Sequence, residues 1–126
     1  MSEQKKLQFS KSHEWVEFTS DTTARIGLTD FAQEFLGGIV FVSLPEVGDE
    51  LTAKESLGDV ESVKAVSDII SPLSGKVAKI NETVIDSPDL INERPYEAWL
   101  VEVSDITSQD ELLDAEAYEA FCSENA

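Results

Sequence analysis

Short runs in which apolar and polar residues alternate dominate the first two thirds of the chain and predict β-strands. Residues 13–18 (HEWVEF) and 23–28 (TARIGL) form two such runs around the polar turn TSDT. Alternation of this kind, with β-branched and aromatic residues at apolar positions, is typical of half-buried strands. Further strand patterns between residues 39 and 80 are separated by turn residues such as Gly48 and Asp49. The pattern therefore predicts a mainly β protein.

One early segment has the spacing of a helix instead. Residues 30–36 (DFAQEFL) begin with Asp30, which we expect to cap the amino end with Gln33 reaching back. Gly37 and Gly38 follow, and glycines at this place end helices by adopting a left-handed conformation.

The end of the chain predicts a second helical segment over about residues 108–124. Ser108 and Glu111 have the spacing of a capping box, and Asp114 can cap the run AEAYEAFCSE that follows. Helical spacing places one stripe of side chains toward the core: Tyr118, Phe121 and Cys122.

The region between the helices is predicted to hold a polar connection, residues 81–96, and one more strand, residues 97–103 (EAWLVEV). One face of that strand carries Trp99, Val101 and Val103. Trp15, Trp99 and the phenylalanines are expected in the core. With strands in the middle and helices outside, we expect a small β-sandwich or barrel with peripheral helices. The length fits a single domain, 1–126, with its core at about 13–104.

The charge balance is strongly acidic, with 26 Asp and Glu residues against nine Lys and Arg residues and a net charge of −17. Such a surface repels phosphate backbones and anionic membranes, so we expect neither nucleic acid nor a membrane as partner. It favours solubility, and it can steer the chain toward basic patches on partner proteins. No apolar run approaches the roughly 18–20 residues that span a bilayer, and MSEQKKLQFS lacks a signal peptide's apolar stretch. We expect a cytoplasmic bacterial protein.

The inventory of catalytic groups is thin. His13 is the single histidine and Cys122 the single cysteine, so neither a histidine pair for a metal nor an internal disulfide can form. The common catalytic and phosphate-binding motifs are absent from the sequence, which disfavours a hydrolytic enzyme. We expect His13 to have a packing or hydrogen-bonding role.

Lys64 occupies an unusual place in the stretch DVESVKAVSD, residues 59–68. The flanking strand patterns put it in a turn made of Ser62-Val63-Lys64-Ala65, without the Asn-Gly or Asp-Gly pair that hairpins usually recruit. Such a turn must be type I or a similar form, and we expect it to be stiff. A stiff exposed tip suits presentation of one amine to an enzyme that must distinguish it from six other lysines.

The same stretch, ESVKAVSD followed by SPLSGKV, resembles the lipoyl-lysine motif of the glycine cleavage system H-protein family. HEWV, IGLTDFAQEFLG, IVFVSLPEVGDE, INERPY and ELLDAEAYEAF resemble segments of that family in the same order, across residues 13–121. Members carry a glutamate three residues before the lysine and a glycine eleven after it, the positions of Glu61 and Gly75. The lipoylation motif implied around Lys64 comprises Glu61, Ser62, Val63, Ala65 and Gly75.

The resemblance implies a lipoyl-domain-like barrel-sandwich hybrid with peripheral helices and a lipoate joined covalently to Lys64. In the family, a pyridoxal-phosphate glycine decarboxylase loads an aminomethyl group onto the lipoyl arm. A tetrahydrofolate-dependent aminomethyltransferase then removes the carbon, and dihydrolipoamide dehydrogenase restores the disulfide. A separate lipoylating enzyme attaches the lipoate. The resemblance thus implies a monomeric carrier that catalyses no step itself, in agreement with the thin catalytic inventory.

The family's loaded arm folds into a cleft, where a carboxylate can pair with the amine of the aminomethyl group. We expect Glu14 to be that carboxylate, and Asp68 is the second candidate.

The chain departs from the family pattern at three places. Lys54 stands where members commonly have a turn glycine, which predicts an altered or strained turn. Asp59 replaces a residue that is usually apolar, and two residues separate Tyr96 from Trp99 where members commonly have three.

Other functions fit parts of the same pattern. An H-like protein could relay lipoyl groups to other enzymes, and a non-lipoylated acidic scaffold could keep the fold. A biotin carrier fits less well, because its lysine lies between two methionines whereas Lys64 lies between Val63 and Ala65.

Overall fold

The structure is a computed structural model that describes residues 7–124. Its strands are β1 (Gln8–Phe9), β2 (Glu14–Phe18), β3 (Ala24–Leu28), β4 (Ile39–Ser43), β5 (Glu50–Leu51), β6 (Ser56–Ser62), β7 (Val66–Ile70), β8 (Leu73–Ile80) and β9 (Val101–Gln109). Its helices are α1 (Asp30–Leu36), α2 (Glu82–Asp86), α3 (Leu90–Glu93) and α4 (Ala115–Glu124).

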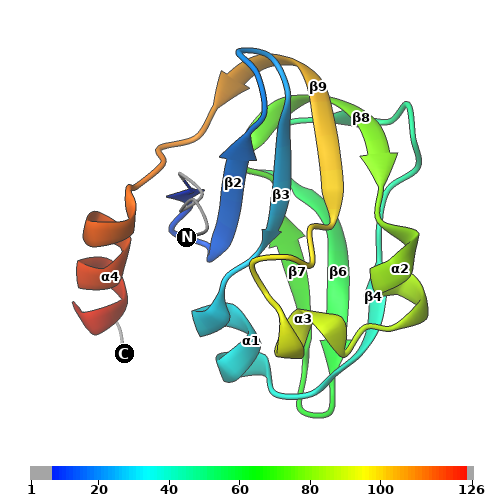
Figure 1. The fold of residues 1–126 in the computed structure, drawn as a ribbon, viewed down its shortest axis with the longest axis vertical. Coiled ribbons are helices and arrows are strands. Elements are labelled where there is room, and N and C mark those ends of the chain that lie inside the picture. The colour runs from blue at the N-terminus through cyan, green and yellow to red at the C-terminus, as the bar shows by residue number, and fades with distance from the viewer. Residues whose placement is uncertain (1–6, 125–126) are drawn as a thin grey trace, which may run out of the picture.

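The strands form two antiparallel sheets that face each other (Figure 1). The larger sheet has the order β1-β2-β3-β9-β8-β5, and the smaller one the order β4-β6-β7. The helices lie outside this sandwich, with α4 beyond the β1–β2 edge of the larger sheet. The mainly β sandwich with peripheral helices confirms the fold class that the strand pattern predicted.

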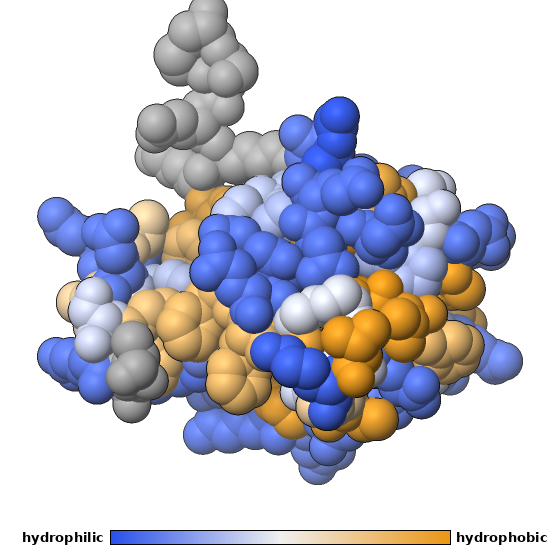
Figure 2. All heavy atoms as spheres, turned by 90° about the horizontal axis from the view of Figure 1, so that it is seen from below, coloured by the Kyte–Doolittle hydropathy of each residue, from blue (hydrophilic) through white to orange (hydrophobic). Residues whose placement is uncertain are grey.

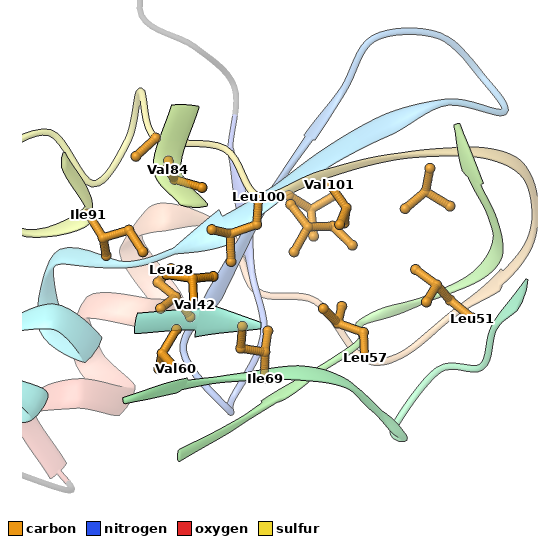
Figure 3. Packing of buried hydrophobic residues seen from close by; sticks show 14 of the residues in the cluster. Leu28, Val42, Leu51, Leu57, Val60, Ile69, Val84, Ile91, Leu100 and Val101 are labelled. Carbon is orange, nitrogen blue, oxygen red and sulfur yellow. The ribbon is translucent and has the colours of Figure 1, made fainter. Parts of the chain in front are cut away.

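One apolar core fills the space between the sheets. Figure 3 shows its side chains meeting from both layers, among them Leu28 and Val101 from the larger sheet and Val60 and Ile69 from the smaller one. These four side chains are almost completely shielded from solvent. Burial of such side chains contributes about 1.5–3 kcal/mol each, so this core holds the two sheets together.

A second, smaller cluster lies on the outer face of the larger sheet and receives α4. Trp15, which points away from its core-facing neighbour Val16, packs there with Phe9 and Tyr118. Gly27 lies opposite Trp15 in the ladder, where a Cβ would be 2.4 Å from the indole ring, so a side chain at that position would displace the tryptophan. The inward orientation predicted for Tyr118, Phe121 and Cys122 is confirmed by this cluster.

The predicted cap of the first helix is wrong by one residue. Thr29 is the N-cap of α1, and its side chain accepts a hydrogen bond from the Ala32 amide. Asp30 is instead the first helical residue, and its carboxylate accepts a bond from the Gln33 side chain. Both Thr and Asp are good caps, so the sequence did not decide between adjacent candidates. The stop at Gly37, which has φ 82°, is confirmed.

The polar connection of residues 81–96 contains the two short helices α2 and α3, which the sequence did not predict. They bury Val84 and Ile91 in the main core. The following strand also begins later than expected, at Val101, so Trp99 lies outside it and packs in the second cluster.

The predicted helical segment over 108–124 is too long. Strand β9 continues through Ser108 to Gln109, because it pairs there with the start of β8. Ser108 therefore caps no helix, and α4 begins at Ala115 behind Asp114, whose carboxylate accepts a bond from the Ala117 amide.

Some expectations about single residues are also settled. Lys54 has φ 77°, so the turn does adopt a left-handed conformation that suits glycine. The prediction that all phenylalanines lie in the core is wrong for Phe35 and Phe41, whose side chains are 73% and 52% exposed. No helix within residues 7–124 is long and apolar enough to cross a membrane.

Candidate functional site

Lys64 lies at the tip of the β6–β7 hairpin, as the sequence predicted (Figure 1). The Ser62 amide donates to the Ala65 carbonyl at 2.8 Å, and the Ser62 hydroxyl accepts bonds from the amides of Lys64 and Ala65. Neither Val63 nor Lys64 has a positive φ, so the turn needs no glycine or asparagine. The serine side chain takes over the ordering role that special turn residues usually have.

The hairpin tip is also fastened to the loop after α1. The Val63 amide donates to the Gly38 carbonyl at 3.0 Å. The Lys64 side chain runs past Gly37, where a Cβ would lie 3.2 Å from Cε. Lys64 is exposed, and its Nζ forms no ion pair with any residue of the described part of the chain. The tip thus presents a primary amine on a fixed backbone.

The structure places the implied lipoylation motif in two regions. Glu61, Ser62, Val63 and Ala65 surround Lys64, with Glu61 exposed opposite Val66 in the hairpin ladder. Gly75 lies in β8 of the other sheet, at a register shift against β9, where a Cβ would be 2.7 Å from the Ser104 carbonyl. The space at Gly75 therefore serves packing between strands rather than contact with Lys64.

A cavity of about 380 Å³ opens next to the hairpin. Helix α1, the start of β2 and strands β6 and β7 form its walls. Most of its lining is apolar, and its polar side chains include both carboxylates expected in the cleft. The lining residues are Ser12, His13, Glu14, Leu28, Phe31, Ala32, Phe35, Leu36, Val60, Ser67 and Asp68. Because Gly37 directly follows Leu36, the Lys64 side chain lies near this wall of the cavity.

Glu14 is a buried carboxylate, 1% exposed, held by three donors. Its Oε1 accepts bonds from the hydroxyls of Ser10 at 2.6 Å and Ser12 at 2.5 Å, and its Oε2 accepts one from the Ile70 amide at 3.1 Å. Burial raises the pKa of Glu14 to about 7, against the lowering effect of these hydrogen bonds. The group is therefore poised between its charged and neutral forms near neutral pH.

Asp68 also lines the cavity, on the edge strand β7, and is exposed. The two candidate carboxylates thus belong to one cavity but differ in environment. A cation inside the cavity would find a buried acceptor in Glu14 and a solvated one in Asp68.

His13 packs in the wall of the cavity, as expected for a structural histidine. Its ring stacks on Phe31 at 4.5 Å between centroids, and its Nδ1 is 2.7 Å from the Tyr118 hydroxyl. Burial lowers the pKa of His13. Its φ of 74° is rare for a residue with a side chain.

Sequence reasoning missed several residues of this site: Ser10, Ser12, Phe31, Phe35 and Tyr118. A signal for the serines was available, because hydroxyls two and four residues before Glu14 can reach its carboxylate across a tight turn. Tyr118 is 105 residues from His13, and no local pattern could have paired them.

Apolar side chains are exposed around the hairpin tip. Figure 2 views this end of the molecule, where hydrophobic residues gather among hydrophilic ones. The exposed large apolar residues of α1, β4 and the hairpin are Phe35, Val40, Phe41, Val63 and Val66. Single exposed apolar residues are ordinary, but a group of them beside an unpaired lysine indicates a surface that meets other molecules.

No group of three or more His, Cys, Asp or Glu residues within positions 7–124 could hold a metal ion. The site instead offers one exposed amine and an apolar cavity with a buried carboxylate. An amine can form an amide with a carboxylic acid, and a long apolar arm attached there would find the cavity beside it.

Comparisons with known proteins agree with this geometry. The family model described as "Glycine cleavage H-protein" matches residues 7–125. The glycine cleavage system H protein of Lachnoclostridium phytofermentans is 54% identical over 115 residues, covering 91% of each chain. That of Vibrio campbellii is 56% identical over 117 residues, covering 90% of this chain and 93% of the relative.

A solved structure is similar as well. The crystal structure of a glycine cleavage system H protein from Mycobacterium marinum superposes with a TM-score of 0.86 at 40% identity and covers 98% of each chain.

Proposed function

Since the chain belongs to the glycine cleavage H-protein family and acts as a lipoyl carrier in glycine cleavage, we propose that Lys64 carries the lipoyl group. The group is joined to Nζ through an amide. The observation that carries this proposal is the exposed, unpaired amine on the ordered hairpin tip beside the cavity.

Amide formation changes what the Lys64 side chain can do. It removes the positive charge of Nζ, so no ammonium group has to lose its water when the arm meets an apolar surface. Phe35 and Leu36 of α1 line the cavity, and the Lys64 stem passes Gly37, the residue that follows Leu36. When bound, the lipoyl group supplies a disulfide that accepts two electrons together with a one-carbon unit.

We assign Glu14 to the amine of the aminomethyl cargo. A cation beside a carboxylate favours its charged form, so the arriving amine would lower the pKa of Glu14 from about 7 and form a charge-assisted hydrogen bond. The apolar lining keeps bulk water away from the cargo. Asp68 is a second, exposed carboxylate at the same cavity.

The chemistry itself belongs to separate enzymes in this proposal. A glycine decarboxylase loads the arm, an aminomethyltransferase unloads it, dihydrolipoamide dehydrogenase reoxidises it, and a lipoylating enzyme attaches the lipoate. The chain's own residues hold, shield and present the arm and catalyse no step. The relatives are bacterial proteins, which supports a place in the cytoplasm.

The carrier role of Lys64 is tested by loading from glycine. Purified lipoylated protein is mixed with glycine decarboxylase and labelled glycine, and label on the protein is counted. Wild type should acquire label, and Lys64→Arg, which keeps the charge but cannot form the amide, should acquire none. Label on Lys64→Arg equal to wild type would refute the assignment.

The role of Glu14 is tested by the lifetime of the cargo. The loaded protein is freed of enzymes, and release of formaldehyde and ammonium is followed as water cleaves the carbon–sulfur bond and leaves a thiol. Removal of the buried charge in Glu14→Gln should speed release about ten-fold, since charge-assisted hydrogen bonds contribute about 1.5–3 kcal/mol. Asp68→Asn, which removes the charge of the exposed second carboxylate, should speed release less. An unchanged lifetime in Glu14→Gln would remove Glu14 from the proposal.

A further inference from the structure

Tyr118 connects the C-terminal helix to two walls of the cavity. Its hydroxyl lies 2.7 Å from His13 Nδ1 and 2.7 Å from Thr29 Oγ1. Its ring stacks on Phe9 with centroids 4.7 Å apart, and the side chain is 7% exposed. Burial raises the pKa of the Tyr118 phenol, so the hydroxyl keeps its proton and can donate one bond while it accepts another.

His13 is the first of these two partners and lies directly between Ser12 and Glu14. A residue with a side chain adopts a φ of 74° only when surrounding contacts hold it there. The His13 amide donates to the Ser10 carbonyl, and the His13 carbonyl accepts from the Thr29 amide at 3.2 Å. The ring is held by Phe31 on one side and by the Tyr118 hydroxyl. Tyr118 thus contacts the turn that aims the Glu14 carboxylate.

Thr29 is the second partner and directly precedes α1, which forms another part of the cavity wall. Its hydroxyl caps α1 by accepting from the Ala32 amide at 3.2 Å. Helix α1 supplies four lining residues of the cavity: Phe31, Ala32, Phe35 and Leu36. A single phenol therefore bonds to both the turn that carries Glu14 and the residue that starts α1.

We infer that Tyr118 is a positioning residue for the carrier reaction, because it fixes through His13 the turn that holds Glu14 against the aminomethyl cargo. This inference rests on the proposed function of Glu14. It assigns the C-terminal helix a task at the cavity although α4 contributes no lining residue among those of the described chain.

The substitution Tyr118→Phe isolates the hydroxyl. The phenylalanine ring can still stack on Phe9, and the segment before α4 remains paired through Phe9 and Leu113, whose two backbone bonds are each 2.7 Å. We expect hydrolytic release of the cargo from isolated loaded Tyr118→Phe to be about five-fold faster than from wild type, the size expected for the lost bond to His13.

The matched control is Ser74→Ala. This substitution also removes one hydroxyl, which accepts a hydrogen bond from the Ala53 amide at 2.8 Å. Ser74 lies in β8 and does not line the cavity that holds Glu14. Its cargo lifetime should equal that of wild type. If Ser74→Ala speeds release as much as Tyr118→Phe, the effect is general loosening and the inference is overturned.

A double variant tests the route through Glu14. If Tyr118 acts by positioning Glu14, the variant Tyr118→Phe/Glu14→Gln should release the cargo no faster than Glu14→Gln alone. If the release rate of the double variant is increased by the product of the two single effects, the inference is overturned. A Glu14→Gln lifetime equal to wild type would overturn the proposed function of Glu14, whereas a normal lifetime in Tyr118→Phe beside a shortened one in Glu14→Gln would overturn only the inference.

A second readout needs no lipoyl group. In the unlipoylated protein, hydrogen exchange of the Thr29 amide, which donates to His13, and of the Ile70 amide, which donates to Glu14, should be about five-fold faster in Tyr118→Phe. Exchange at the Lys64 amide in the hairpin tip should not change. Unchanged protection at both Thr29 and Ile70 would overturn the inference.

Discussion

At the scale of single residues, Glu14 shows how a carboxylate can be kept in a mostly apolar cavity. Three donors hold its oxygens, yet the loss of water is the larger effect and raises its pKa to about 7. Charging a buried carboxylate destabilises the folded state, because the charged form has lost its contact with water. This cost is consistent with a site kept for a positively charged cargo.

The raised pKa of Glu14 predicts how stability depends on pH. Between pH 4.5 and about 7 the folded protein holds a proton on Glu14 that the unfolded chain has lost, so stability falls as pH rises through this window. Full charging costs roughly 3 kcal/mol. The free energy of unfolding of Glu14→Gln relative to wild type should therefore increase from low pH to above pH 7, when measured by urea denaturation.

The control for this experiment is Glu17→Gln, on the same strand but only half-buried. Its difference from wild type should change much less with pH. A difference between Glu14→Gln and wild type that stays constant across the pH range would contradict the burial argument.

Lys54 gives a second prediction at this scale. Its φ of 77° is left-handed, which costs a residue with a Cβ about 1–2 kcal/mol relative to the right-handed form. The ion pair with Asp110 is 3.8 Å long and 75% exposed on the lysine side, so its contribution is small. Lys54→Gly should raise the free energy of unfolding by roughly 1 kcal/mol in chemical denaturation. Lys54→Ala, which keeps the Cβ, should not, and equal effects of both substitutions would contradict the strain argument.

At the scale of elements, the hairpin tip depends on one serine. The Ser62 hydroxyl accepts bonds from two amides of the turn, which fixes the backbone beneath the Lys64 side chain. The sequence showed that glycine and asparagine were missing from this turn, but not which side chain replaced them.

Loosening that turn should impair recognition of Lys64. Ser62→Ala removes the acceptor for both amides, and we expect the catalytic efficiency of the lipoylating enzyme to fall about three-fold, within the range of one weak hydrogen bond. Steady-state lipoylation of the unmodified protein measures this. Ser67→Ala is the control, because its hydroxyl makes only a 3.4 Å bond within β7. Equal efficiency in Ser62→Ala and wild type would show that tip stiffness is not used.

Element boundaries were predictable where local signals decided them and not where pairing did. The alternation of apolar and polar residues predicted the hairpin of β2 and β3, and helical spacing followed by Gly37 predicted α1. The end of β9 at Gln109 is set by pairing with β8, a tertiary effect that overrode the local capping pattern at Ser108. Helices α2 and α3 are each a turn or so long and flank Pro88, which made their segment indistinguishable from a loop.

At the scale of the whole molecule, one end carries the parts that the carrier role needs. The hairpin tip and α1 lie together at the lower end in Figure 1, so Lys64 lies beside the end of α1 although Leu36 and Lys64 are 28 positions apart in the sequence. The turn pattern and the family resemblance predicted Lys64 and the two carboxylates as site residues, and their roles stay predictions. The cavity that gathers Glu14 and Asp68 arises only when the two sheets pack, which no local pattern could reveal.

The central claim is that one lysine among seven carries the lipoyl group. Intact-mass analysis of protein from cells supplied with lipoate, followed by peptide mapping, tests it directly. We predict a single lipoyl increment located on Lys64, retained in Lys76→Arg and lost in Lys64→Arg. An unmodified Lys64 under these conditions, or an increment that persists in Lys64→Arg, would contradict the claim.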